Sequence, residues 1–145
     1  MLARINVKVN LNAQPKAKYF AKVLAPNYDT SFYLLGWTPS SLDSHNILYE
    51  IVGCRKPGDK SGRGGWNLAG YCDPKIDEIA DKVEGETDKT KRDALIKEGF
   101  DVLNADWGYI PLHQQALAWG VSKKVHLTQR ADNLLLLYWV SKDPQ

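Results

Sequence analysis

The sequence has few of the residues that build metal sites or reactive thiols. Its 145 residues include two cysteines and three histidines, and His45, His113 and His126 stand far apart. A zinc site needs about four closely spaced ligands, so we predict no metal and no cofactor. Nucleophile-elbow, phosphate-loop and dinucleotide-binding patterns do not occur. We predict that the chain is not an enzyme, and a small hydrolase is disfavoured because no nucleophile, base and orienting group stand in a catalytic pattern.

Charge of one sign and long apolar runs are lacking as well. Lys and Arg total 19 against 17 Asp and Glu, a formal net charge of +2. Because the basic residues are scattered, we expect no nucleic acid and no anionic membrane surface as a partner. The longest apolar run, residues 134–137, is far too short to span a bilayer. No signal peptide precedes the alternating stretch at the start, and we interpret the chain as a piece of a longer protein.

The two cysteines bracket a stretch that has no periodicity and many glycines. Residues 53–65 read as a long loop, and Cys54 and Cys72 lie at its two sides, outside any Cys-x-x-Cys pair. We favour a disulfide between them, which would remove about 3 kcal/mol of loop-closure entropy from the unfolded chain. Such a bond indicates an oxidising compartment. Two reduced thiols are the alternative.

Strand patterns stand at the start and the end of the chain. Residues Ile5–Leu11 alternate apolar and polar side chains, and Ser31–Trp37 are nearly all apolar, as in a strand buried on both faces. We expect an extended region from Tyr109 to about Val121 and a last strand over Leu134–Val140.

Helix signals alternate with these strands. Pro15 starts a helix that ends before Pro26, and Asp43 or Ser44 can cap a short helix carrying Ile47. Two further helices follow, one opened by Asp73-Pro74 and ended by Gly85, the other capped by Asp88. The apolar positions that we expect these two helices to bury are Ile76, Ile79, Ala80, Val83, Leu95, Ile96, Phe100, Val102 and Leu103. The order predicts an α/β fold, with parallel strand pairing through right-handed crossovers and a mixed sheet flanked by helices.

Aromatic residues mark two candidate binding positions. Trp37 ends the predicted strand and enters a polar turn, where ligands bind in open α/β sheets. A tryptophan there can cover an apolar ligand face, although a core tryptophan is an equal alternative. Trp66, Asn67 and Tyr71 form a second cluster, for which packing beneath the loop is the favoured role.

These residues resemble a known family. Gly36-Trp37-Thr38 with Asp43 and Asn46 resembles the binding-strand segment of bacterial family 5 extracellular solute-binding proteins, the dipeptide, oligopeptide and nickel binding proteins of ABC importers. Residues 66–77 resemble their Asn-x-x-x-Tyr-x-Asn/Asp-Pro-x-hydrophobic-Asp motif. Further matches are Thr87-Asp88, Arg92, Ala105-Asp106 and residues 109–113, which resemble the family's paired helices and its Ile-Pro-Leu strand. The resemblance runs in order over nearly the whole chain.

The resemblance implies a fold and an organisation. Residues 1–118 would be part of the C-terminal lobe of a two-lobed, type II-like periplasmic binding protein. Residues 119–145 would cross back and pack on an N-terminal lobe encoded upstream, which would give the tail strands their partners. The dipeptide-binding members carry a cysteine pair in this place, which supports the Cys54–Cys72 bridge. The implied location is the periplasm.

The resemblance also implies a function and a site. The whole protein would trap a peptide or peptide-like solute by lobe closure and deliver it to an ABC permease in the inner membrane. Gly36, Trp37 and Thr38 would lie along the ligand backbone, held by strand-like hydrogen bonds. Ser40 replaces the Asp that binds the ligand's N-terminal amine, so either Asp43 takes that role or the ligand is not a simple free-amine peptide. Asn67 is a further candidate contact, although Asn67, Tyr71 and Asp77 look structural in the family.

Other readings stay open at this point. The chain can be a structural piece of a lobe without binding activity of its own. Its parent can bind a non-peptide solute such as a metal chelate, an opine or a sugar. Exposed sheet edges would also allow a dimer or a strand swap of the isolated chain.

Overall fold

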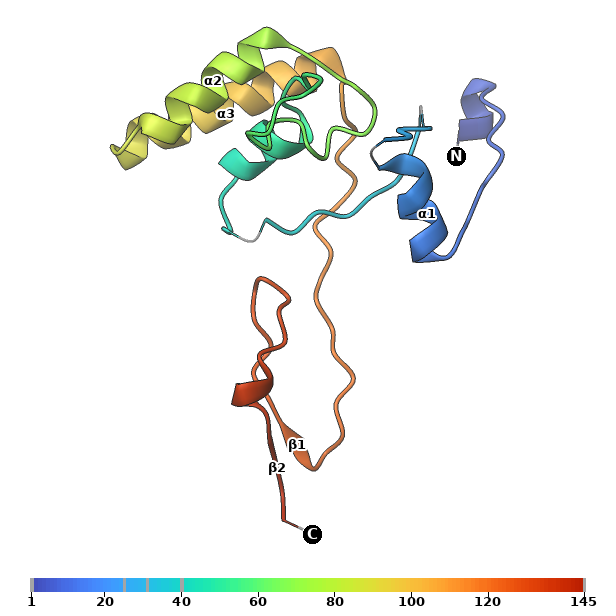
Figure 1. The fold of residues 1–145 in the computed structure, drawn as a ribbon, viewed down its shortest axis with the longest axis vertical. Coiled ribbons are helices and arrows are strands. Elements are labelled where there is room, and N and C mark those ends of the chain that lie inside the picture. The colour runs from blue at the N-terminus through green and yellow to red at the C-terminus, as the bar shows by residue number, and fades with distance from the viewer. Residues whose placement is uncertain (1, 25, 31, 40, 145) are drawn as a thin grey trace. The chain divides into compact units, whose positions relative to one another are not determined.

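The structure is a computed structural model that describes residues 2–24, 26–30, 32–39 and 41–144. The chain divides into two compact units, residues 1–33 and residues 34–145, and each is described here by itself. Figure 1 shows the course of the chain with its helices and strands labelled.

The first unit contains one α-helix. α1 spans Lys16–Val23, as predicted from Pro15, and the N–H of Leu24 closes its last turn on the carbonyl of Phe20 at 3.0 Å. The predicted strand over Ile5–Leu11 is wrong. Leu2–Ile5 form a 3-10 turn, η1, and residues 7–11 are exposed and belong to no strand of the described structure. Alternation alone does not make a strand, because the backbone needs a neighbouring strand for its hydrogen bonds.

The second predicted strand is wrong as well. Ser31 lies outside the described residues, and residues 32–37 form neither helix nor strand. Phe32 and Leu34 are 72% and 73% exposed rather than buried on both faces. A strand of a parallel sheet needs partners on its edges and helices over its faces, and the described structure holds no parallel pair.

A helical core organises the second unit. It consists of a π-helical turn, η2, over Ile47–Ile51, and of two α-helices, α2 over Pro74–Gly85 and α3 over Lys89–Asp106. α2 and α3 lie side by side as the predicted helical hairpin, and η2 packs against both (Figure 1). The buried cluster that joins these three elements consists of Leu48, Val52, Ile76, Ala80 and Leu103.

Local capping explains where the two long helices begin. The Asp73 carboxylate accepts a hydrogen bond from the N–H of Lys75 at 2.9 Å, and Pro74 occupies the first position of α2. Asp88 does the same for α3, accepting from the N–H of Lys91 at 2.9 Å. Both predicted starts are confirmed.

The burial predictions for α2 and α3 fare differently. All four apolar positions predicted for α2 are buried, whereas α3 buries Leu103 fully and its other predicted positions in part. Gly99 of α3 is also buried. A Cβ there would lie 2.8 Å from the Leu48 Cδ1 atom, so the glycine lets α3 approach η2 closely.

The C-terminal residues contain the only sheet of the described structure. β1, Val125–His126, pairs antiparallel with β2, Ser141–Lys142. The strand predicted over Leu134–Val140 is wrong, because Leu137–Trp139 form a 3-10 turn, η3, and the strand starts only at Ser141. Residues 110–121 adopt no regular structure. The fold is therefore a small helix-dominated domain with a two-stranded sheet, and none of its described helices is long and apolar enough to cross a membrane.

Candidate functional site

The Trp37 side chain is held in place by a polar contact on its edge and a ring on its face. Its Nε1–H donates to the Oδ1 atom of Asn46 at 2.7 Å. Its ring lies 5.1 Å from the Trp66 ring, centroid to centroid, with an interplanar angle of 58°. Asn46 precedes η2, and Trp66 follows the loop, so two segments position one indole. Both tryptophans are half-buried.

The backbone on either side of Trp37 is open. Gly36 and Thr38 are exposed, whereas Leu35, Trp37 and Pro39 are half-buried, so exposure alternates residue by residue. Within the described part of the chain, Gly36 and Thr38 make no hydrogen bond. A Cβ at Gly36 would meet no atom within 4 Å. Beside a fixed indole, this segment therefore presents backbone donors and acceptors at Gly36 and Thr38 that no described residue engages.

Asp43 is engaged by other residues of the chain. One carboxylate oxygen accepts from the N–H of His45 at 2.9 Å. This contact lies before η2, whose N-cap is Asn46 without a side-chain hydrogen bond, so the cap predicted from Asp43 or Ser44 is wrong. The other carboxylate oxygen of Asp43 lies 2.8 Å from the Arg92 guanidinium of α3. Partial burial raises the pKa of Asp43, but the His45 hydrogen bond and the Arg92 charge outweigh it, so the net pKa lies below the ordinary value. Asp43 is thus ionised and paired at neutral pH.

A hollow of about 440 Å³ lies beside this ion pair. Its walls come from the turn before η2 and from the start of α3. The residues that line it are Ser41, Leu42, Asp43, Ser44, Thr87, Lys89, Arg92, Asp93 and Ile96. Ser40, the position where the resemblance implies a departure, lies outside the described residues.

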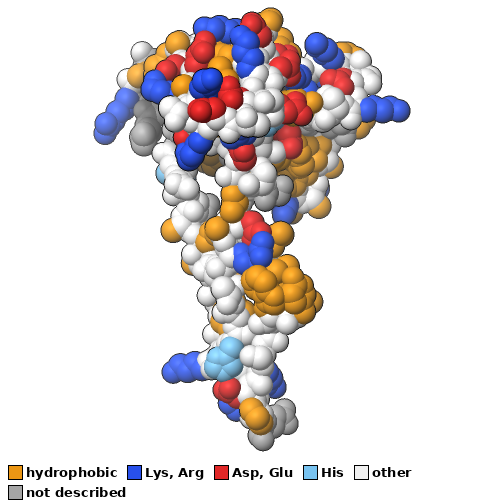
Figure 2. Space-filling view, turned by 90° about the vertical axis from the view of Figure 1, so that its left-hand side faces the viewer, with side chains coloured by type: hydrophobic (Ala, Val, Ile, Leu, Met, Phe, Trp, Pro, Cys, Tyr) orange, Lys and Arg blue, Asp and Glu red, His pale blue; other side chains and the backbone are white. Residues whose placement is uncertain are grey.

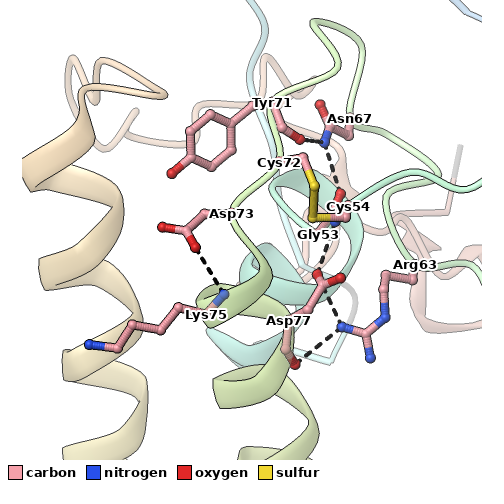
Figure 3. The surroundings of a disulfide bond; sticks show 9 residues. All are labelled: Gly53, Cys54, Arg63, Asn67, Tyr71, Cys72, Asp73, Lys75 and Asp77. Carbon is pink, nitrogen blue, oxygen red and sulfur yellow. Dashed lines mark hydrogen bonds and ion pairs between the residues drawn. A yellow bond between two sulfur atoms is a disulfide. The ribbon is translucent and has the colours of Figure 1, made fainter.

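The predicted disulfide is confirmed. Cys54 and Cys72 are bonded, with their Cα atoms 4.5 Å apart, and they connect the end of η2 to the start of α2 (Figure 3). Asp77 of α2 reinforces this link, since its Oδ1 atom accepts from the Cys54 N–H at 2.9 Å and lies 3.2 Å from the Arg63 guanidinium. The disulfide, the Asp77–Cys54 hydrogen bond and the Asp77–Arg63 ion pair together hold the loop between the cysteines.

Asn67 joins the loop to its surroundings from inside. Its side chain is fully buried, and its Nδ2 atom donates to the carbonyl of Gly53 at 2.8 Å and to the carbonyl of Tyr71 (Figure 3). Its Oδ1 atom accepts from the Tyr109 hydroxyl at 3.5 Å. These contacts fit the structural role that the motif implies. A contact between Asn67 and a ligand stays a prediction. The Asn67 side chain is fully buried and exposes no atom to a ligand in this structure.

Tyr71 has an unusual hydroxyl. The Tyr71 oxygen is buried and has no hydrogen-bond partner among the described residues. Burial, together with the nearby Asp106 and Asp73 carboxylates, raises the pKa of Tyr71 to about 12. The ring packs edge-on against Tyr109 and leaves no room for a Cβ at Gly108. Asn67 and Tyr71 of the second cluster therefore pack beneath the loop, as the sequence favours, whereas Trp66 lies against Trp37.

One residue of the site has no counterpart in the sequence prediction. The Glu50 carboxylate accepts from the Nδ2 atom of Asn46 at 2.5 Å, so Asn46 bridges Trp37 and Glu50. The available signal was the i, i+4 spacing of Asn46 and Glu50 on a helical turn, which brings such side chains together. Within the described residues, no group of three or more His, Cys, Asp or Glu side chains could hold a metal ion.

Fold and site together define a class: a small, helix-dominated, disulfide-bonded domain with a half-buried indole pair beside an open backbone segment. No protein-family model, no curated protein and no solved structure matches the chain. The family resemblance of the motifs therefore stays a prediction, and what it implies about function is a proposal.

Proposed function

We propose that the chain is the ligand-binding part of a periplasmic solute-binding protein of an ABC importer. It would hold a peptide or peptide-like solute between this domain and a second lobe, and deliver it to a permease in the inner membrane. The observation that carries the proposal is the Trp37 indole, fixed at its edge by Asn46 and on its face by Trp66, beside unpaired backbone.

The fixed indole supports solute binding because an ordered aromatic ring loses little entropy on contact with a ligand. Its ring offers a flat apolar surface for a side chain or an aliphatic stem. The Asn46 hydrogen bond already satisfies the indole N–H. The exposed part of the ring is therefore free for apolar contact rather than polar recognition.

The open backbone at Gly36 and Thr38 supports a peptide or peptide-like solute in particular. An extended chain can bind such a segment as an added strand, through main-chain N–H and C=O groups. The empty space around the Gly36 Cα lets another backbone approach. The alternation of exposed and half-buried residues matches the period that strand addition requires.

Two further features fit the proposal. The Cys54–Cys72 disulfide is compatible with an oxidising compartment such as the periplasm. The C-terminal residues expose several large apolar side chains, and the view in Figure 2 shows hydrophobic side chains gathered in one patch in the lower part of the picture. Apolar surface of this kind marks an interaction site, and a second lobe that completes the cleft is the partner we propose for it.

Native mass spectrometry of the protein exported to a bacterial periplasm, and purified without unfolding, tests the proposal. We expect a non-covalent adduct of peptide-like mass. Trp37→Ala should lose it, because the apolar wall is gone. The matched control is Trp107→Ala, since Trp107 is an exposed tryptophan at the end of α3, outside the site. Absence of any adduct, or equal retention in both variants, would favour a structural piece without binding activity.

A further inference from the structure

We propose that the first unit, residues 1–33, is a contact surface for an anionic phospholipid membrane. This unit contains η1 and α1 and is drawn in blue in Figure 1. The inference goes beyond solute binding and does not depend on it. It concerns contact with the membrane surface, because no described helix is long and apolar enough to cross a bilayer.

Charge is divided unevenly between the two units. The net charge of the whole chain is only +2, and the expectation of no membrane partner used that count. The first unit holds five Lys and Arg against one Asp, a net charge of +4. The second unit holds 14 Lys and Arg against 16 Asp and Glu, a net charge of −2. The whole-chain count therefore conceals a cationic first unit.

Most positive charges of the first unit are not compensated within it. Lys22 is the exception, because its ammonium lies 2.6 Å from the carboxylate of Asp29, the one acidic residue of this unit. Lys16 is exposed, and its Nζ atom lies 5.9 Å from the centroid of the Phe20 ring. The exposed cations that make no ion pair or side-chain hydrogen bond within the described part of the chain are Arg4, Lys8 and Lys18.

Exposed apolar side chains accompany these cations. Among the described residues of the first unit only Val23 is buried, whereas Leu11 is 92% exposed and Ile5 is 67% exposed. The other large apolar side chains that are exposed in this unit are Leu2, Val7, Val9 and Phe32. Single exposed apolar residues are ordinary, but here they outnumber the buried ones and share a short segment with Lys8. The unit thus presents positive charge and apolar surface together.

An anionic bilayer fits both features. Its headgroups attract Lys and Arg side chains near the surface, and the boundary of its acyl chains accepts apolar side chains. A nucleic acid would attract the same cations, but its phosphate backbone offers no apolar surface to Ile5 and Leu11. A neutral bilayer would accept the apolar side chains and leave the charge without a counterpart.

Cosedimentation of the full chain with vesicles tests the proposal. We expect binding to vesicles of phosphatidylglycerol mixed with phosphatidylcholine, but not to pure phosphatidylcholine, and we expect high salt to weaken it. Lys8→Gln combined with Lys18→Gln should weaken binding by about 25-fold, since each cation near the surface contributes about fivefold. Ile5→Ser should weaken it by about fivefold or more, because less apolar surface enters the interface.

The matched control combines Lys123→Gln with Lys124→Gln, at two exposed lysines of the second unit, and should leave vesicle binding nearly unchanged. All of these side chains are exposed, so the free energy of unfolding should stay the same in every variant. Equal binding to both kinds of vesicle, an equal loss in the two double variants, or full binding by Ile5→Ser would overturn the proposal. Tighter binding to duplex DNA than to the anionic vesicles would also overturn it, in favour of a nucleic-acid partner.

Discussion

At the scale of single residues, one buried amide holds the loop together. Asn67 is the one fully buried polar side chain among the described residues, and it contacts three segments through Gly53, Tyr71 and Tyr109. A buried polar group stabilises only when its partners are in place, and its removal leaves those partners without a donor. The position therefore tolerates little change.

Asn67→Ala should destabilise the protein by about 2–4 kcal/mol, because the carbonyls of Gly53 and Tyr71 lose their donor inside the fold. The measurement is the free energy of unfolding in urea. Asn104→Ala, on the exposed face of α3, is the matched control and should change stability by about 0.5 kcal/mol or less. Similar values for both variants would show that the Asn67 bonds contribute little.

The raised pKa of Tyr71 predicts that the stability of the fold depends on pH in the alkaline range. Its folded pKa of about 12 lies above the ordinary tyrosine value of 10.0, so the folded state favours the neutral phenol. This contribution to stability is fully present below pH 10.0 and is lost as the pH rises toward about 12. Ultraviolet absorbance should show one tyrosine ionising late. Tyr71→Phe should remove that step and weaken the alkaline loss of stability, because phenylalanine carries no ionisable group.

The control for this titration is Tyr138→Phe, at a side chain that is 78% exposed. It should leave the late step in place. Since the Tyr71 hydroxyl has no hydrogen-bond partner among the described residues, Tyr71→Phe should also be neutral or slightly stabilising at neutral pH. A marked loss of stability there would show that the hydroxyl makes a bond in solution.

At the scale of elements, the loop between the cysteines has a backbone conformation that leaves no room for a side chain at Gly64. Gly64 adopts a left-handed φ of 61°, and a Cβ there would lie 2.5 Å from the carbonyl oxygen of Gly53. The loop therefore returns tightly against the end of η2. This close return brings Cys54 within bonding distance of Cys72 and sets Trp66 against Trp37.

Reducing the Cys54–Cys72 bond should lower the free energy of unfolding by about 3 kcal/mol, because the unfolded chain regains the freedom of the loop. Thermal denaturation with and without a thiol reductant measures the effect. A variant with both cysteines replaced by serine should match the reduced protein and respond no further to reductant. An unchanged melting temperature in reductant would count against the contribution of the bridge.

At the scale of the whole molecule, the C-terminal residues leave several large apolar side chains about half exposed or more. The two short strands β1 and β2 bury little of it. The exposed large apolar side chains there are Leu134, Leu135, Leu137, Tyr138 and Trp139. Such a surface calls for a partner, which in the proposed function is a second lobe.

Without that partner, we expect the 145-residue chain to self-associate as its concentration rises, since apolar surface drives association. Gel filtration with light scattering measures the mass. Replacing Leu134, Leu135 and Leu137 with serine should shift the chain toward the monomer. Leu11→Ser, at an exposed leucine of the first unit, is the control and should leave the mass unchanged. A monomer at every concentration would contradict this prediction.

Features that depend on near neighbours in the chain could be predicted from the sequence. The starts of α2 and α3 follow from Asp73-Pro74 and Asp88, whose caps reach only two or three residues ahead. The buried face of α2 follows from its apolar spacing. The sequence favoured the disulfide over two reduced thiols, with support from the family resemblance, and the structure confirms it.

Features that depend on distant partners were decided only by the tertiary structure. The two front strands failed because a strand takes its hydrogen bonds from another segment, and no such segment lies beside them in the described structure. The sequence singled out Trp37 but could not reveal that Asn46 links it to Glu50, nor that Arg92 already pairs with Asp43. Residue identities determined which groups could bind; the folded contacts determined which of them are still free to do so.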